Sequence, residues 1–225
     1  MIESLLPRDV CCAEAFGDLP GAVLLDEEER DFVHAGPGRR RQSTTVRHLA
    51  RQALARLGHA PAPVPRGPGG APHWPDGVVG SMTHCAGYRA AVVADGRRLA
   101  AVGIDAEPHA ALREGTLATI SLPRERRLLA ERHEGDPSIH WDRLLFSAKE
   151  AVYKCWYPLS LTPLDFGDVD VVFRAEGGHF DASVHPGGPA PGASAAPRTF
   201  TGRWAVAHGL IITAVSAPPV TGRRA

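Results

Sequence analysis

A helical segment followed by a group of short apolar segments occurs twice along the chain, and this near-repeat limits the folds it can adopt. The first helical segment, residues 43–58, places an apolar stripe on one face and ends at Gly58. The second, residues 139–156, is amphipathic in the same way, and Pro158 beyond it predicts its end. Strands are expected at residues 78–82, 89–95 and 97–105, and again at 168–175, 199–207 and 210–216. The pattern predicts an α/β (α+β) fold in two halves, residues 1–106 and 107–225, related by a weak duplication.

Turn residues support this division. We expect residues 89–95 and 97–105 to form a hairpin that turns at Asp95 and Gly96. The turn between the last two strands, at residues 207–209, has a similar sequence. Residues 58–77, between the first helix and its strands, are too rich in proline and glycine for regular structure and are expected to form a surface loop.

The charge balance argues against a partner attracted by the overall field of the molecule. The 225 residues include 25 Lys and Arg and 25 Asp and Glu, so the formal net charge is zero. Such a chain has no general attraction to nucleic acid or to an anionic membrane. Its first residues lack the basic start and apolar run of a signal peptide, and no segment has the length of a membrane span, so a cytoplasmic protein is expected. The four cysteines show no CxxC spacing and suggest neither a zinc site nor a disulfide framework.

Two carboxylates, Asp105 and Glu107, lie two residues apart at the end of an apolar segment, in the sequence VGIDAEPH. Side chains at i and i+2 of a strand point to the same face, so the two acids are expected side by side. Neighbouring carboxylates repel each other unless a cation lies between them, and oxygen ligands favour Mg²⁺. Taken alone, two solvated acids at a strand end explain the pattern at least as well.

The second helical segment carries the only two lysines of the chain, Lys149 and Lys154, on either side of Glu150, while the other 23 of the 25 basic residues are arginine. Lysine is a compact, rotatable donor, whereas arginine is a fixed planar fork. Ser147, Glu150 and Lys154 share one helix face, and Lys149 lies about a quarter-turn away. If this face packs toward the two acids, it completes a metal site that handles phosphate, with one carboxylate as a base. The alternative is a solvated face with a Glu150/Lys154 pair.

Other basic residues are compatible with an anionic ligand. Guanidinium groups and free backbone N–H groups at a helix start both favour phosphate, and the first helix is preceded or begun by four arginines, Arg39, Arg40, Arg41 and Arg47. His84 follows a short strand and can donate to a phosphate. A solvated arginine run and a polar surface histidine are the alternatives.

The motifs VGIDAE, FSAKEAVYK and SMTHC resemble those of the surfactin-type 4′-phosphopantetheinyl transferases, in particular the compact single-chain forms that serve polyketide, nonribosomal peptide and lipid synthases. The arginine-bearing helix and the sequence WDRLLF match as well, so the resemblance covers about residues 30–215. It implies two similar α/β halves with pseudo-two-fold symmetry and an active site in the cleft between them. It also implies transfer of the 4′-phosphopantetheine arm of coenzyme A to a serine of an apo carrier protein, with release of 3′,5′-ADP and dependence on Mg²⁺.

The resemblance assigns roles to individual residues. Asp105, Glu107 and Glu150 would hold Mg²⁺ together with the pyrophosphate of coenzyme A. Glu150 would also activate the carrier serine, directly or through a metal-bound water. Lys154 would contact the pyrophosphate and the leaving phosphate, and Lys149 the pyrophosphate region. The remaining contacts with coenzyme A would come from Arg39, Arg47 and His84 at the 3′-phosphate and from the Thr83 backbone at the adenosine.

The implied partners are apo acyl carrier and peptidyl carrier proteins or domains of polyketide, nonribosomal peptide or fatty-acid synthases, with coenzyme A as co-substrate. No nucleic acid and no membrane is implied, and a monomer is expected because one chain completes the site. Arg40, Arg41 and Arg51 are expected to be surface or carrier-docking residues. The sequence leaves open which carriers are served, whether acylated coenzyme A is accepted, and whether Mn²⁺ can replace Mg²⁺.

Two positions depart from the family pattern. Many relatives carry two basic residues in the loop that corresponds to residues 64–75, whereas this chain has Arg66 but Gly69 and Gly70 near the second position. It is therefore open whether this loop, including Arg66, contacts the cofactor. Ala106, between the two acids, cannot be a metal ligand as the residue there can be in related proteins.

Two other functions could use the same residues. One is a Mg²⁺-dependent phosphoesterase that cleaves coenzyme A or a nucleotide, and the other is a non-catalytic module that binds coenzyme A. The lack of a clear water-activating histidine argues against the first, and the presence of both Glu150 and Lys154 argues against the second.

Overall fold

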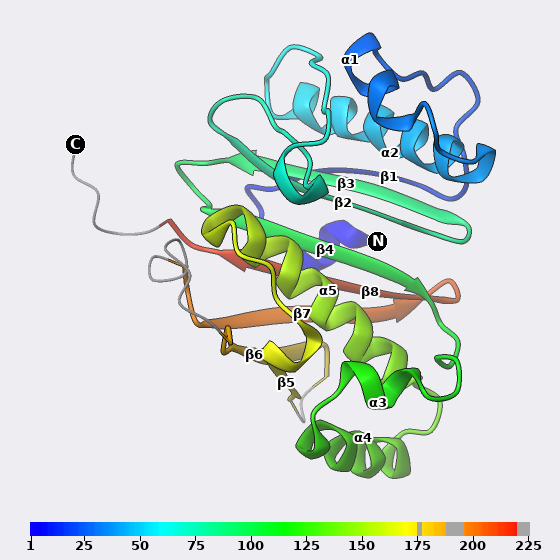
Figure 1. The fold of residues 1–225 in the computed structure, drawn as a ribbon, viewed down its shortest axis with the longest axis vertical. Coiled ribbons are helices and arrows are strands. Elements are labelled where there is room, and N and C mark those ends of the chain that lie inside the picture. The colour runs from blue at the N-terminus through cyan, green and yellow to red at the C-terminus, as the bar shows by residue number, and fades with distance from the viewer. Residues whose placement is uncertain (175–176, 188–195, 220–225) are drawn as a thin grey trace.

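The computed structural model describes residues 1–174, 177–187 and 196–219 and contains two antiparallel sheets, each packed against a 20-residue helix (Figure 1). The three-stranded sheet has the order β1-β3-β2, with β1 (Cys11–Ala15), β2 (Val78–Cys85) and β3 (Tyr88–Asp95). The five-stranded sheet has the order β4-β8-β7-β6-β5, with β4 (Ala101–Pro108), β5 (Val169–Phe173), β6 (His179–Val184), β7 (Thr199–Ala207) and β8 (Leu210–Ala217). This mixture of helices and sheets confirms the predicted fold class.

Helix α2 (Pro37–Arg56) covers the three-stranded sheet. It begins six residues before the predicted start because Pro37, whose fixed φ suits a first helical turn, initiates it ahead of the arginines. Its predicted apolar stripe is buried, and Leu49 and Leu54 pack with Ala91 and Val93 of β3. The short helix α1 (Asp26–Glu29) precedes it. The first half thus consists of one long helix packed on a three-stranded sheet.

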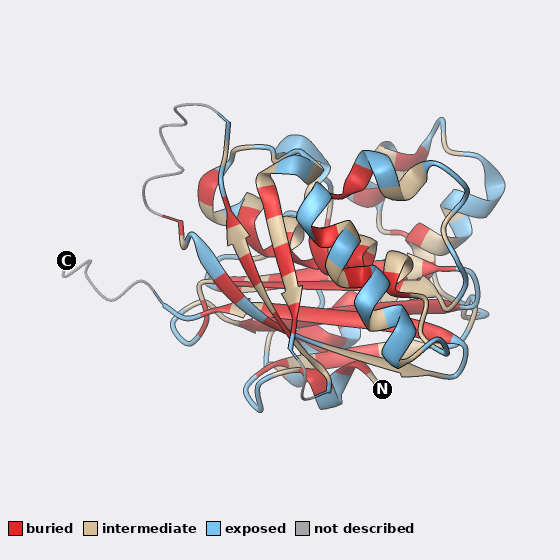
Figure 2. Cartoon of the chain, turned by 90° about the horizontal axis from the view of Figure 1, so that it is seen from below, coloured by how far each residue is buried: buried red, intermediate tan, exposed pale blue. Residues whose placement is uncertain are grey.

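Helix α5 (Trp141–Ser160) lies across β4 and β8 of the second sheet. The approach is closest at Gly103 of β4, where an added Cβ would lie 2.0 Å from the carbonyl oxygen of Ala151 and 2.6 Å from the backbone nitrogen of Cys155. Figure 2 shows the strands as mainly buried and the exposed residues along the outer side of the helices. Glycine at this position lets the helix backbone rest directly on the strand.

The remaining helices, α3 (Thr116–Ile120) and α4 (Pro123–Gly135), lie between β4 and α5 in the sequence, and α4 packs against α5 and β5. None of the described helices combines the length and the apolar composition that a bilayer crossing requires. The fold therefore concentrates its two long helices on the two sheets and leaves the short ones at the periphery.

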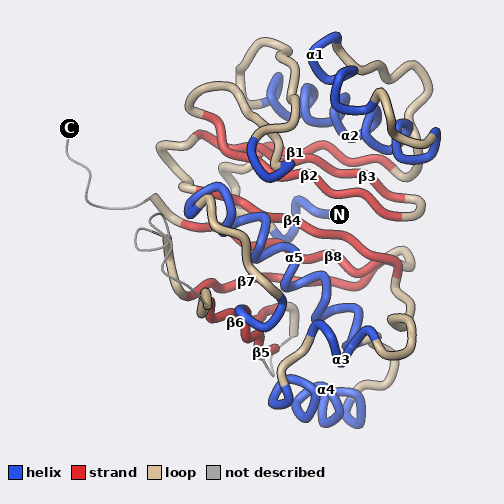
Figure 3. The backbone as a smooth tube through the Cα atoms, in the orientation of Figure 1, coloured by secondary structure: helices blue, strands red, loops and turns tan. Residues whose placement is uncertain are grey.

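The two halves meet where β2 and β4 lie side by side (Figure 3). The two strands belong to different sheets, and side chains connect them: the Ser81 hydroxyl accepts from the Ile104 backbone N–H, and the Thr83 hydroxyl accepts from that of Ala106, both at 3.1 Å. Because both contacts advance by two residues in the same direction, the strands run parallel. We call this contact the hydroxyl seam; it places His84 at the end of β2 close to the acids at the end of β4.

The predicted hairpin at Asp95 and Gly96 is wrong. Strand β3 pairs with β2 through a two-residue turn at residues 86–87, and β4 pairs with β8. The repeated unit therefore starts with a strand and not, as predicted, with a helix. In the first half it consists of β1, α2 and the β2-β3 hairpin, and in the second of β4, α5 and the β7-β8 hairpin. By this pairing the whole of β4 belongs with the second sheet, whereas the boundary expected at residue 106 assigns most of it to the first half.

The predicted end of the second helix is also wrong. Pro158 lies inside α5, which continues to Ser160 and ends where Leu161 adopts a left-handed conformation with φ of 53°. A proline removes one helical hydrogen bond. One missing bond in the last turn does not stop the helix, because its apolar face, including Cys155 and Trp156, is completely buried against the sheet.

Candidate active site

A cleft of about 560 Å³ lies between the halves. Its walls come from α2, the loop of residues 66–74, β2, β4 and α5. Eight of the residues singled out in the sequence line it: Arg39, Arg47, Arg66, Thr83, His84, Asp105, Glu150 and Lys154. Two others, Glu107 and Lys149, are not among its lining residues. The fold thus brings together most of the predicted site from segments more than 100 residues apart.

Asp105 lies at the centre of the acidic side of the cleft. It is 5% exposed, and its Oδ1 accepts from the Lys154 ammonium at 2.7 Å and from the Thr83 hydroxyl at 3.3 Å. Its Oδ2 is buried and has no hydrogen-bond partner among the described residues. A buried carboxylate oxygen without a partner is costly, so this atom is prepared for a further cation or donor. The predicted contribution of Thr83 was its backbone; here its hydroxyl orients the acid.

The other two acids surround Asp105. Burial raises the pKa of Glu150, and the charge of Asp105 raises it further, while Lys154 opposes the rise. Burial and Asp105 likewise raise the pKa of Glu107, although Arg143 donates to its Oε2 at 2.9 Å and opposes the rise. Both shifts have the sign expected for carboxylates that repel one another without an intervening cation.

The three acids fit a hard divalent cation by their chemistry, because all are carboxylates and one buried oxygen of Asp105 lacks a partner. They do not form a ready-made cage: within the described part of the chain, no three His, Cys, Asp or Glu side chains are grouped closely enough to hold a metal ion. Glu107 is engaged by Arg143. A cation here would take its ligands from Asp105 and Glu150 in the cleft and from Glu107 at its edge.

The two lysines have different surroundings. Lys154 is partly exposed and donates to the Ile104 carbonyl at 3.1 Å as well as to Asp105, which places its charge inside the cleft. Lys149 is almost completely buried and donates to Glu125 and to the Phe166 carbonyl, at 2.8 and 2.9 Å. Burial lowers the pKa of Lys149, with Glu125 opposing the change. The predicted contact of Lys149 with a pyrophosphate stays a prediction, and this ion pair does not favour it.

A second, smaller cavity of about 190 Å³ lies beside the cleft. Lys149, Leu164 and Phe166 line it, and it shares Glu150 and Tyr153 with the cleft.

The basic side of the cleft is built around Phe32, which is 1% exposed. The guanidinium carbons of Arg47 and Arg66 lie over its ring, 4.5 and 4.8 Å from the centroid, within the range of a cation–π interaction. Arg47 also donates to the Val64 carbonyl at 3.0 Å. Burial lowers the pKa of Arg47 to about 10, and Arg66 and Arg39 contribute to the decrease. These arginines repel one another, so an anion between them would be bound favourably.

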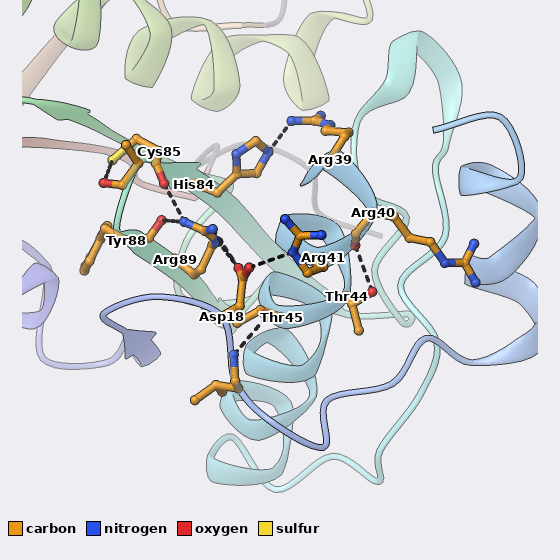
Figure 4. A network of polar contacts seen from close by, with 12 residues as sticks. Asp18, Arg39, Arg40, Arg41, Thr44, Thr45, His84, Cys85, Tyr88 and Arg89 are labelled. Atoms are coloured by element: carbon orange, nitrogen blue, oxygen red, sulfur yellow. Dashed lines mark hydrogen bonds and ion pairs between the residues drawn. The ribbon is translucent and has the colours of Figure 1, made fainter. Parts of the chain in front are cut away.

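His84 extends from β2 toward the start of α2, where it contacts the Arg39 guanidinium (Figure 4). Burial lowers the pKa of His84 to about 4, and the charge of Arg39 adds to the decrease. The imidazole is therefore neutral at physiological pH. Below it in Figure 4, Asp18 bridges Arg41 of α2 and Arg89 of β3, with Arg89 at 2.7 Å, and so ties the helix to the sheet behind His84.

The loop that departs from the family pattern lines the cleft and lies against α5. Gly69 has a φ of +63°, and an added Cβ would lie 2.1 Å from the Tyr157 hydroxyl of α5. A lysine at this position would be strained and would clash with the ring. Arg66 and Gly69 both line the cleft, and Gly69 also brings the loop against Tyr157 of the second half.

The expectation for Arg51 is wrong. Arg51 is 9% exposed, and its Nη1 donates to both carboxylate oxygens of Glu28, at 2.8 and 2.7 Å. Glu28 also accepts from the Val64 backbone N–H at 2.8 Å. The pair binds α2 to the segments on both sides of it. Arg40 is partly exposed and pairs with Glu29, while Arg41 is exposed, as expected for surface residues.

Sequence reasoning missed Phe32, Arg143 and Tyr157. Arg143 precedes Glu150 by seven and Lys154 by eleven residues, so helical spacing alone places it on their face. Tyr157 lies seven residues after Glu150 and could have been found in the same way. Phe32 follows no period, and its role depends on a tertiary contact that the sequence does not display.

Comparisons with known proteins agree with this geometry. Residues 27–94 match the 4′-phosphopantetheinyl transferase N-terminal domain, and residues 101–180 match the 4′-phosphopantetheinyl transferase superfamily. The chain is 46% identical over 225 residues to 4′-phosphopantetheinyl transferase Svp of Streptomyces mobaraensis, an alignment that covers 99% of this chain and 91% of the relative.

Two further relatives are similar along nearly their whole length. 4′-phosphopantetheinyl transferase PptT of Mycobacterium tuberculosis is 44% identical over 230 residues, which cover 96% of this chain and 97% of PptT. 4′-phosphopantetheinyl transferase Npt of Nocardia iowensis is 44% identical over 223 residues, which cover 96% of this chain and 99% of Npt. With both halves of its cleft contained in these matches, the chain is an enzyme of the 4′-phosphopantetheinyl transferase superfamily.

Proposed function

We propose that the cleft binds coenzyme A and transfers its 4′-phosphopantetheine arm to a serine hydroxyl of an apo carrier protein, with release of 3′,5′-ADP. The observation that supports this most is Asp105, which has one oxygen on Lys154 and one buried oxygen without a partner among the described residues. It faces a cleft whose other side carries arginines. This division into an acidic and a basic side suits a ligand with a pyrophosphate at one end and a further phosphate at the other.

The basic side would hold the adenosine end of coenzyme A. Arg39 and Arg47 can donate to the 3′-phosphate, and neutral His84 can donate one further hydrogen bond. Arg66, whose guanidinium group also lies over the Phe32 ring, can reach the same phosphate or the adenine. Thr83 would border the adenosine by its backbone while its hydroxyl is occupied by Asp105.

The acidic side would hold Mg²⁺ through Asp105, Glu107 and Glu150, and Mn²⁺ is a suitable replacement by ligand type. A bound metal ion would neutralise negative charge on the pyrophosphate. Lys154, fixed beside Asp105, would add positive charge at the leaving phosphate.

In the transfer itself, the serine oxygen forms a bond to the β-phosphorus of coenzyme A, and the bond from that phosphorus to the bridging oxygen breaks, so that 3′,5′-ADP leaves. Glu150 would accept the serine proton. Burial and Asp105 raise the pKa of Glu150 in the metal-free chain, whereas a bound cation would lower it again. Positioning and charge neutralisation supply most of the rate in such reactions.

The partners that we propose are apo acyl carrier and peptidyl carrier proteins or domains of polyketide, nonribosomal peptide or fatty-acid synthases. A monomer is proposed because both sides of the cleft belong to one chain. A cytoplasmic location stays a prediction from the sequence.

The test is to incubate the chain with coenzyme A, Mg²⁺ and an apo acyl carrier protein and to determine the carrier mass by mass spectrometry. We expect the carrier to gain one phosphopantetheine group in proportion to the 3′,5′-ADP released. Consumption of coenzyme A without a gain in carrier mass would instead support the phosphoesterase, and binding without consumption would support the non-catalytic module.

A further inference from the structure

Charged side chains on one face of α5 meet the acids of β4 in a regular way. Lys154 pairs with Asp105 and Arg143 pairs with Glu107, at 2.7 and 2.9 Å, and Glu150 lies between the two cations along the helix. Residues 143, 150 and 154 are seven and four positions apart, so they share this face. Each β4 acid therefore has its own cation on α5. Lys154 has a place in the proposed function, whereas Arg143 has none.

Arg143 makes three hydrogen bonds with three different nitrogens. Nη1 donates to Glu107 Oε2 at 2.9 Å, Nε donates to the Ala110 carbonyl at 3.1 Å, and Nη2 donates to the Ala111 carbonyl at 3.1 Å. Its side chain and that of Glu107 are each 20% exposed, so the pair is mostly shielded from water. A lysine has one nitrogen and cannot reproduce this arrangement of three separate donors.

The same helical turn holds the segment that follows Glu107. The Leu112 backbone N–H donates to Asp142 at 2.7 Å, and the His140 backbone N–H donates to His109 at 3.2 Å. Residues 109–112 carry no regular secondary structure. The first turn of α5 thus fixes the chain directly after the last acid of the site.

We propose that Arg143 is a positioning residue for Glu107 and thereby sets the metal affinity of the site. Arg143 occupies Oε2 of Glu107, and among the described residues Oε1 has no hydrogen-bond partner, so that oxygen is left for a cation. The two carbonyl contacts hold the guanidinium group against residues 110–111 and so fix the carboxylate that it binds. This inference rests on the proposed function, because it takes Glu107 as a metal ligand.

The charge of Arg143 acts in the opposite sense, since a guanidinium group near a bound cation repels it. The two effects predict different outcomes for substitutions. If positioning dominates, Arg143→Met and Arg143→Lys both weaken metal binding, because both lose the three-donor arrangement. If repulsion dominates, Arg143→Met binds the metal more tightly and Arg143→Lys resembles the wild-type protein.

The test is to titrate Mn²⁺ into the intact chain saturated with coenzyme A and to measure free Mn²⁺ by electron paramagnetic resonance, with a blank of coenzyme A alone. We expect Arg143→Met to raise the Mn²⁺ dissociation constant about tenfold, the size typical for loss of a partner of a metal ligand. In transfer assays the Mg²⁺ concentration for half-maximal rate should rise by a similar factor, while kcat at saturating Mg²⁺ stays near the wild-type value.

Two controls separate this role from a merely structural one. In a Glu107→Gln background, Arg143→Met should weaken Mn²⁺ binding no further, because Arg143 acts through that carboxylate. Arg126→Met removes a half-buried arginine that donates to the Ser121 carbonyl at 2.8 Å, away from the cleft, and should leave Mn²⁺ binding unchanged.

Unchanged or tighter Mn²⁺ binding by Arg143→Met would overturn the positioning role, and so would an equal loss in the Glu107→Gln background. A wild-type chain that transfers the arm but binds no Mn²⁺ would overturn the metal site and this role while leaving the transfer intact. A chain that binds Mn²⁺ with the expected dependence on Arg143 but modifies no carrier would overturn the proposed function alone.

Discussion

Glu150 is the residue at which metal binding and proton transfer would coincide. Glu150→Gln removes a charge and a base but keeps the size of the side chain. We expect turnover to fall at least about 10²-fold, the usual minimum for loss of a general base. Coenzyme A should bind within a few-fold of wild type at zero Mg²⁺, since the arginines are unchanged; calorimetric titration and single-turnover transfer measure the two effects. Near-normal turnover would remove Glu150 from the mechanism.

Phe32 should affect recognition of the 3′-phosphate without touching the reacting groups. Phe32→Leu keeps an apolar side chain but removes the ring that lies beneath the guanidinium groups of Arg47 and Arg66. Two such contacts are worth about 0.5–1 kcal/mol each, or about 1–2 kcal/mol together, so we expect coenzyme A to bind roughly five- to thirtyfold more weakly. Binding of 3′-dephospho-coenzyme A should change much less. An equal loss for both ligands would mean that Phe32 only supports the fold.

His84 should make the free enzyme less stable in acid. Its pKa is about 4 in the folded chain, because of burial and Arg39, and about 6.5 when unfolded. Between these values the unfolded state binds more protons, so the contribution of neutral His84 to stability is complete above pH 6.5 and is lost as the pH falls toward 4. Denaturant unfolding between pH 7 and 4 should show a steeper decline for the wild-type chain than for His84→Gln. Parallel profiles would contradict the low pKa.

Arg143 and Phe32 illustrate why individual site residues differ in how far the sequence predicts them. The acids and Lys154 could be found because strand and helix periods place them on defined faces, and His84 because it follows a short predicted strand. Lys149 satisfies a similar pattern but lies in a buried pair with Glu125, a residue 24 positions away on α4. Helical spacing shows that Lys149 lies about a quarter-turn from Glu150. It does not show whether that position faces the cleft or the core, because this depends on the elements that pack against the helix.

At the scale of elements, the contact between α5 and β4 decides the geometry of the acidic side. Gly103→Ala would place a methyl group 2.0 Å from the Ala151 carbonyl oxygen, a backbone atom that cannot move away alone. We expect a loss of about 1–3 kcal/mol in the free energy of unfolding, together with lower transfer activity because Lys154 and Glu150 shift relative to Asp105. Chemical denaturation and the carrier assay measure both. Gly135→Ala, where an added Cβ meets nothing within 4 Å, is the matched control and should be nearly neutral.

The sequence predicts elements with a clear hydrophobic period well, but it does not predict which strands pair with one another. The apolar stripes of α2 and α5 were found, but β1, with only five residues and no β-branched residue among them, gave no pattern. Strand β4 was assigned to the wrong partner because a turn sequence at Asp95 and Gly96 suggests a hairpin, while the choice between β3 and β8 depends on which apolar faces α5 covers. Pairing of strands separated by about 100 residues is a tertiary property.

At the scale of the whole molecule, the hydroxyl seam holds the two halves in register. Ser81→Ala would leave the completely buried Ile104 N–H without its acceptor. Such a loss costs about 1–3 kcal/mol, so we expect a lower unfolding midpoint and weaker binding of coenzyme A, whose site spans the halves. Ser138→Ala removes an exposed hydroxyl and should stay within about 0.5 kcal/mol of wild type. Equal stability of the two variants would show that the seam contributes little.

The connection from β3 to β4 separates the two sides of the cleft by sequence as well as in space. Every arginine proposed to grip coenzyme A lies before residue 96, and every proposed metal ligand and Lys154 lie after residue 100. Neither portion alone contains both a grip for the cofactor and the groups that act on it. We therefore expect that, if the chain is cut in the β3-β4 connection, neither fragment transfers the arm alone and activity returns only when the two fragments associate.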